Sequence, residues 1–73
     1  KFVNVTTMAG QGARTEIRDI DRLVSAYGGT AADWKKQAGK VSSDKYIFDV
    51  HWYERDDGIQ HDMKLKSRSE KKK

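Results

Sequence analysis

The sequence predicts an α+β domain, in which one or two N-terminal helices pack on a three- to four-stranded antiparallel sheet that ends in a β-hairpin over residues 45–67. Two observations lead to this class. Apolar residues recur at helical spacing between Thr15 and Tyr27, whereas the chain from Tyr46 onward is rich in aromatic and β-branched residues. We therefore expect the helices to come before the main part of the sheet.

The size of the chain limits what it can build. It has 73 residues, of which 36% are hydrophobic and 36% are charged, and a chain this short buries only about 60% of its unfolded surface. We expect one domain over residues 1–67 and a charged, flexible tail over residues 68–73. Any site is expected to be an open groove, because so small a core cannot enclose a deep enzyme pocket.

Several classes are excluded by composition. The absence of cysteine excludes disulfide scaffolds, thiolate zinc sites and cysteine nucleophiles. The two histidines are expected on opposite strand faces, so no metal site is predicted, and no cofactor is expected. No stretch approaches the roughly 20 apolar residues of a membrane-spanning segment, and no signal peptide is visible.

The first half of the chain predicts a strand and a helix. Residues 2–7 indicate a short strand or an extended arm, and residues 9–13 a flexible loop. The helix is expected over residues 15–27, with Thr15 as its cap and Gly28-Gly29 as its stop.

The next segment connects the helix to the hairpin. Residues 30–33 resemble a capping box with Asp33 in the place of glutamate, which predicts a short helix running through Trp34. A strand is expected near residues 38–43. We expect Trp34 and Trp52 to lie in the core.

The hairpin has the strongest signal. Asp57-Gly58 favours a two-residue turn between strands at residues 46–55 and 59–66. In that register the apolar side chains of both strands fall on one face. These are Tyr46, Phe48, Val50 and Trp52 on the first strand and Ile59, Met63 and Leu65 on the second. His61 is expected at the rim of this face, in a structural role.

The same register defines the other face. It pairs His51 with Lys64, Tyr53 with Asp62, Asp49 with Lys66 and Arg55 with Gln60. Metal-independent RNA cleavage needs a base for the ribose 2′-hydroxyl, an acid for the leaving oxygen, and cations for the charge on phosphorus. We predict catalytic roles for His51, Tyr53 and Lys64. Lys66, Arg14 and Arg55 are predicted to bind phosphate.

Other interpretations stay open at this point. A polar strand face with mixed charges is commonly just solvated, with its Asp–Lys pairs as ordinary cross-strand contacts. The net charge of +4 indicates an acidic partner, but three of the positive charges are in the terminal lysines at residues 71–73. The chain could be a non-catalytic RNA-binding module or a basic protein-interaction module.

Three segments in order carry a resemblance to a known group. They are IRDIDRLV at 17–24 with YGG at 27–29, DWKK at 33–36, and VHWYE at 50–54 followed by KLK at 64–66. This order resembles the C-terminal toxin domains of bacterial polymorphic and contact-dependent growth inhibition systems, within the ribonuclease group of barnase, EndoU, colicin and RelE.

The resemblance implies a hydrolase: an antibacterial nuclease toxin that cleaves RNA, with tRNA as the expected substrate. The positions that match are His51 and Tyr53 in one motif and Lys64 and Lys66 in the other. It also implies an immunity protein complex and, in some systems, a host cofactor protein such as an elongation factor. The domain would be secreted as part of a large effector and would act in the target-cell cytoplasm.

Overall fold

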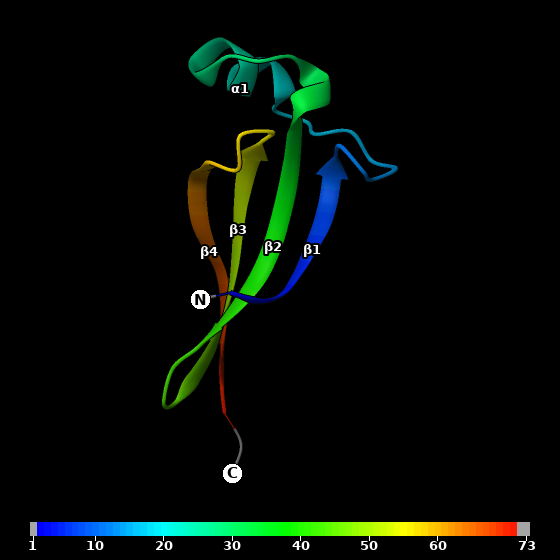
Figure 1. Cartoon of the computed structure of the whole chain (residues 1–73). Coiled ribbons are helices and arrows are strands. Elements are labelled where there is room, and N and C mark those ends of the chain that lie inside the picture. The colour runs from blue at the N-terminus through cyan, green and yellow to red at the C-terminus, as the bar shows by residue number, and fades with distance from the viewer. Residues whose placement is uncertain (1, 72–73) are drawn as a thin grey trace.

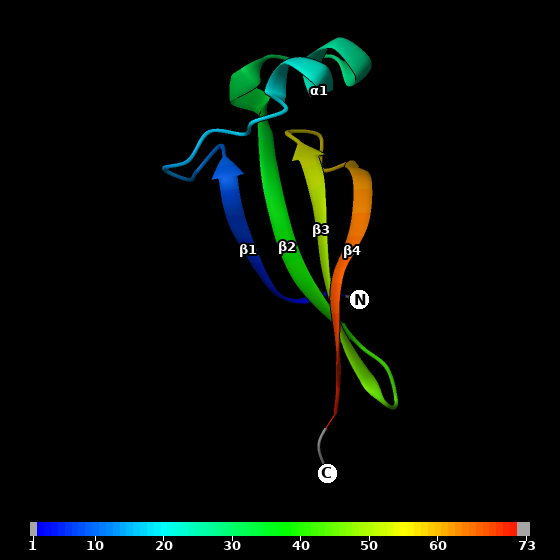
Figure 2. The ribbon, with the colours of Figure 1, turned by 180° about the vertical axis from the view of Figure 1, so that it is seen from behind.

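The computed structural model describes residues 2–71, which form a four-stranded antiparallel sheet with a short helix across one end (Figure 1). In chain order the elements are β1 (Val3–Gly10), α1 (Ile20–Tyr27), the 3-10 helix η1 (Ala31–Asp33), β2 (Trp34–Ser42), β3 (Tyr46–Arg55) and β4 (Gln60–Glu70). The strands lie in the order β1-β2-β3-β4. Figure 2 shows from behind that α1 and η1 lie together above the ends of the strands.

The predicted layout of helices followed by a sheet is wrong. A strand comes first, since β1 pairs antiparallel with β2 at the edge of the sheet, and α1 lies in the connection between these two strands. The signal for β1 is weak in the sequence because two irregularities interrupt its register with β2 and Asn4 has a positive φ of 54°. Such bulges break the alternation by which a strand is recognised.

The helix is shorter than predicted. α1 begins at Ile20 rather than Thr15, and Asp19 is its N-cap. Thr15 instead accepts a hydrogen bond through its carbonyl from the Gly10 amide at 2.7 Å, which ties this segment to the end of β1. Ile17 is buried beside the helix without belonging to it. Its contribution to the core explains why the apolar spacing continues beyond the true start of α1.

The second predicted helix is reduced to one 3-10 turn. The Asp33 carboxylate accepts hydrogen bonds from the backbone amide of Thr30 at 2.8 Å and from its hydroxyl at 3.1 Å. The backbone is already extended at Trp34, so β2 starts there and not near residue 38. Trp34 is completely buried, and its indole N–H donates to the Gly28 carbonyl at 3.1 Å.

The core lies under α1, on the face of the sheet that the sequence predicted to be polar. It consists of Ala9, Ile17, Leu23 and Trp34, with Ile20, Val24 and Tyr53 packed against it. The opposite face holds Trp52, which is also buried and stacks against Phe2 with ring centroids 4.6 Å apart. The two tryptophans are therefore buried as predicted, but on opposite sides of the sheet.

The hairpin keeps the predicted register only at its centre. Val50 pairs with Leu65 and His51 with Lys64, as predicted. Nearer the turn, however, Tyr53 pairs with His61 and not with Asp62, because a bulge intervenes and Asp62 takes a positive φ of 53°. The bulge moves His61 to the side of α1, where its ring stacks on Tyr27 at 4.2 Å between centroids.

A second irregularity lies on the other side of the centre. There Asp49 pairs with Ser67 rather than with Lys66. β4 then continues to Glu70, which pairs with Tyr46, so residues 68–70 are part of the sheet although the sequence assigned them to the tail. The last two residues of that predicted tail, 72 and 73, lie outside the described residues.

Candidate functional site

A groove of about 530 Å³ lies on the face of the sheet that carries α1. Four of the predicted site residues line it: His51 and Tyr53 from β3, and Lys64 and Lys66 from β4. Alternation along each strand directs these side chains to one face, and the His51–Lys64 pairing brings the two strands into register. The groove is partly open to solvent.

His51 is at the centre of this groove. Its Nδ1 atom is buried and has no hydrogen-bond partner among the described residues. Burial lowers the pKa of the imidazole below its ordinary value, and the positive charges of Lys36 and Lys66 lower it further, against a smaller opposing effect of Asp49. Both burial and the neighbouring positive charges disfavour a charged ring, so the lowered pKa favours the neutral imidazole at pH 7. A neutral imidazole is able to accept a proton.

The lysines of the groove are not neutralised by carboxylates. Lys35 lies 3.6 Å from Glu54 and Lys40 lies 2.6 Å from Asp49, so two lysines of β2 are paired. Within residues 2–71, in contrast, Lys36, Lys64 and Lys66 form no ion pair within 4 Å of a carboxylate. Three ammonium groups around one neutral imidazole give the groove a positive potential, which attracts an anion.

Tyr53 is held more firmly than the sequence indicates. Its ring packs against the core under α1, and the Lys36 ammonium lies 5.9 Å from the ring centroid. The cross-strand pairing of Lys36 with Tyr53 accounts for this contact. Because its position is fixed by packing, the phenol hydroxyl can serve as a directed hydrogen-bond donor.

Sequence reasoning did not identify Lys36 or Arg22, and both line the groove. A signal for Lys36 exists, because Trp34 and Lys36 alternate on one face once β2 is taken to begin at residue 34. Arg22 could not have been found in this way, since the position of α1 over the sheet depends on tertiary packing.

α1, which forms one side of the groove, is hydrogen-bonded to β4 at the bulge residue Asp62. The Asp62 carboxylate accepts hydrogen bonds from the Tyr27 hydroxyl at 2.8 Å and from Arg22 Nη1 at 2.9 Å. These two bonds, that of Tyr27 first, lower the pKa of the Asp62 carboxyl below its ordinary value. The positive φ of Asp62 is thus accompanied by contacts that hold the helix at the end of the groove.

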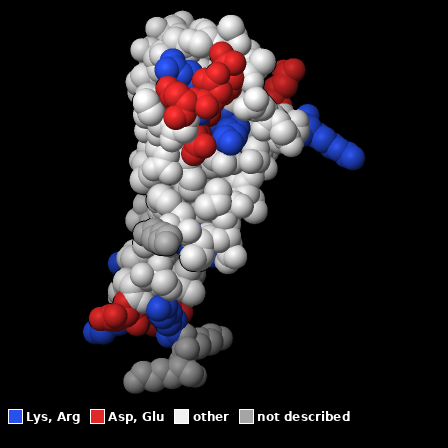
Figure 3. All heavy atoms as spheres, viewed as in Figure 1, with Lys and Arg blue, Asp and Glu red and all other residues white. Residues whose placement is uncertain are grey.

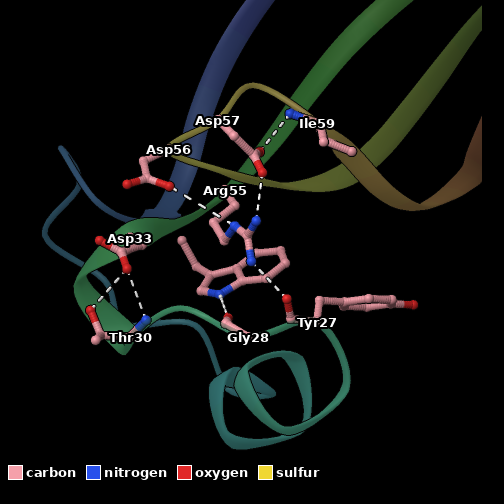
Figure 4. Close-up of polar contacts among 9 residues, drawn as sticks. Tyr27, Gly28, Thr30, Asp33, Arg55, Asp56, Asp57 and Ile59 are labelled. Atoms are coloured by element: carbon pink, nitrogen blue, oxygen red, sulfur yellow. Dashed lines mark hydrogen bonds and ion pairs between the residues drawn. The ribbon is translucent and has the colours of Figure 1, made fainter.

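Arg55 lies outside the groove and supports the turn between β3 and β4 (Figure 4). Its guanidinium donates to the Tyr27 carbonyl and to the Asp57 carboxylate, both at 2.6 Å. A third contact joins its Nε to Asp56 at 3.9 Å. These bonds occupy the guanidinium in linking the turn to the end of α1.

Arg14 is also separate from the groove. It lines a second cavity, of about 550 Å³, together with residues of the β1–α1 connection and of η1. The structure therefore brings four of the six predicted site residues together and leaves Arg14 and Arg55 apart from them.

Among residues 2–71, no group of three or more His, Cys, Asp or Glu side chains is arranged to bind a metal ion. No helix in the same part of the chain has the length and apolarity needed to span a membrane.

Comparison with known proteins adds no relative: no protein-family model, no curated protein and no solved structure matches the chain. The site must accordingly be interpreted from its own geometry.

Proposed function

We propose that this domain is a metal-independent endoribonuclease and that the groove around His51 is its active site. The observation that carries the proposal is the combination of a neutral imidazole with three unpaired lysines in one open groove. A phosphodiester is an anion that gains negative charge in the transition state, so cations fixed nearby stabilise that state more than the substrate.

In this mechanism His51 acts as the base. The neutral imidazole accepts the proton of a ribose 2′-hydroxyl, whose oxygen attacks the adjacent phosphorus. The bond to the 5′-oxygen breaks as that oxygen takes a proton from water, and the resulting hydroxide takes up the proton held by His51. Lys36, Lys64 and Lys66 offset the added charge on the phosphoryl oxygens. The Tyr53 hydroxyl donates a hydrogen bond to one of them. The products are a 2′,3′-cyclic phosphate and a free 5′-hydroxyl.

The setting of this activity is part of the proposal. The resemblance of the three sequence segments supports an antibacterial toxin that is secreted within a large effector and cleaves RNA, most specifically tRNA, in the target-cell cytoplasm. A cognate immunity protein would then cover the basic groove. A host cofactor protein such as an elongation factor is a further partner that the resemblance implies.

Cleavage itself is tested with purified domain and total tRNA in the presence of EDTA. We expect discrete fragments that end in 2′,3′-cyclic phosphates. A synthetic RNA with one 2′-deoxyribose at the cleaved position should be resistant, because it lacks the nucleophile. RNA that is bound but not cut would contradict catalysis and would favour the non-catalytic RNA-binding module.

The role of the lysines is tested by matched substitutions. Lys64→Gln and Lys66→Gln should each slow cleavage by about tenfold or more, since each removes a cation from the charged transition state. Lys45→Gln is the control, because Lys45 is exposed in the turn between β2 and β3 and does not line the groove. Equal rates for all three variants would show that net charge alone matters and would contradict the proposed site.

A further inference from the structure

Within residues 2–71, no layer covers the face of the sheet opposite the groove. Trp52 is buried there by Phe2 and by Gly39, where an added Cβ would lie 3.0 Å from the Trp52 ring and 3.2 Å from Phe2. Beyond these contacts, the apolar side chains of this side are partly or largely exposed, with Leu65 at 58%. We call this surface the open face and define it by Phe48, Val50, Trp52 and Leu65.

The pairing of the strands shows that these residues share one side. Val50 pairs with Leu65 and also with Gly39, and Phe48 pairs with Val41. The N-terminal end of β1 crosses in front of the sheet in Figure 1 and behind it in Figure 2, so Figure 3 displays the open face. Most of the middle of that view carries no charged side chains.

We propose that the open face is an interface with a second copy of this chain, and that two sheets stack through it as a face-to-face dimer. A domain is normally built from at least two packed layers, and here α1 covers only one end of the opposite face. A second sheet about 10 Å away would supply the missing layer.

The available area fits such a dimer. The molecule measures 45 × 23 × 19 Å along its principal axes, so the outline of its broad face is large enough to contain the roughly 800 Å² per partner that a standard stable interface buries.

The charges at the two ends of the face favour a second copy in one orientation. At the end beside the β3–β4 turn, negative charges outnumber positive ones: the two cations there are Lys35 and Arg55. The four carboxylates are Asp33, Glu54, Asp56 and Asp57. At the opposite end, within the described residues, Lys45, Arg68 and Lys71 outnumber Asp44 and Glu70. A two-fold axis between the sheets and across the strands places the acidic end of each copy against the basic end of the other.

The dimer does not depend on the proposed ribonuclease activity. The groove is on the other side of each sheet, so stacking leaves both grooves exposed on the outside. Loss of the dimer and loss of cleavage can therefore be observed separately.

The experiment is sedimentation velocity of the full chain from low micromolar to millimolar concentration. We expect the wild type to dimerise with rising concentration. Leu65→Glu should weaken association by at least about 100-fold, because the two-fold axis buries the added carboxylate in both copies. Leu65 is exposed in the single chain, so this substitution does not disturb the core.

Met8→Glu is the matched control, since Met8 is also an exposed apolar residue, at 43%, but borders a cavity on the α1 side of the sheet with Ile17 and Tyr53. It should dimerise like the wild type. A wild type that stays monomeric at millimolar concentration would overturn the proposal. So would a dimer that survives Leu65→Glu, because it would use another surface such as the edge of β4.

Discussion

Gly10 allows β1 to end against the first residues of β2, and its replacement by alanine should be strongly destabilising. Gly10 has a φ of +87°. A Cβ added there would overlap the Trp34 carbonyl oxygen and lie 2.9 Å from both Ile17 Cδ1 and Lys35 Cα. Two of these three neighbours are backbone atoms of β2, which cannot move without disturbing the sheet.

Gly12 separates the two effects that this substitution combines. Its φ of +84° is nearly the same, but a Cβ there would meet nothing within 4 Å. Gly12→Ala should therefore cost only the backbone strain of a left-handed alanine, about 1 kcal/mol. Gly10→Ala adds the steric overlap, roughly 1–3 kcal/mol more. Both changes stiffen the unfolded chain equally, so that contribution cancels in the comparison.

The difference is large for a domain of this size, whose total stability is expected to be about 4–11 kcal/mol. Thermal unfolding followed by circular dichroism should place the midpoint of Gly10→Ala roughly 10 °C below that of Gly12→Ala, since 1 kcal/mol corresponds to about 4–8 °C in a small domain. Equal midpoints for the two variants would refute the close approach of β1 to β2 at Gly10.

The remaining predictions concern the titrating groups. Lys36→Gln removes a charge that lowers the pKa of His51, so the NMR titration of that ring should move to higher pH, and an unmoved titration would contradict the proximity of the two groups. Folding lowers the pKa of His51, chiefly by burial, so the unfolded chain binds this proton more readily than the folded protein does. The free energy of unfolding should therefore fall as the pH drops below about 6.5 towards the pKa of His51 in the folded protein. His51→Gln should flatten that part of the curve. The pKa of the Asp62 carboxyl is lowered, first by the Tyr27 hydrogen bond. A further loss of stability is therefore expected as the pH falls below 3.8 and through the pKa of this carboxyl in the folded protein. Urea titrations at several pH values should show a smaller loss in Asp62→Asn, whose side chain tolerates the positive φ.

The centre of the site could be predicted from the sequence because it depends on local alternation. The apolar sets around Val50 and Leu65 match in only one register, and that register alone brings His51 opposite Lys64. The bulge at Asp62 could not be predicted in the same way. Asp62 takes its positive φ where Arg22 and Tyr27 from α1 bind its carboxylate, so the shift in pairing depends on contacts between distant parts of the chain.

The predicted arrangement of helix and sheet is wrong for a related reason. Apolar spacing predicts that a helix exists near residues 20–27, but it does not determine which face of the sheet the helix covers. α1 packs against Trp34 and Tyr53 on the face of the sheet that carries His51. Within the described residues, the more apolar face of the hairpin therefore stays uncovered. The sequence pattern of the hairpin alone does not show which of its two faces packs against α1.

In the proposed cleavage of RNA, His51 is the proton acceptor. The most direct test is the single-turnover rate of His51→Ala on a defined RNA in EDTA, with circular dichroism to verify that the variant is folded. Loss of a general base predicts a rate at least about 100-fold below the wild type, with the fold retained because the side chain is only partly buried. A folded His51→Ala protein that cleaves RNA at the wild-type rate would contradict the claim.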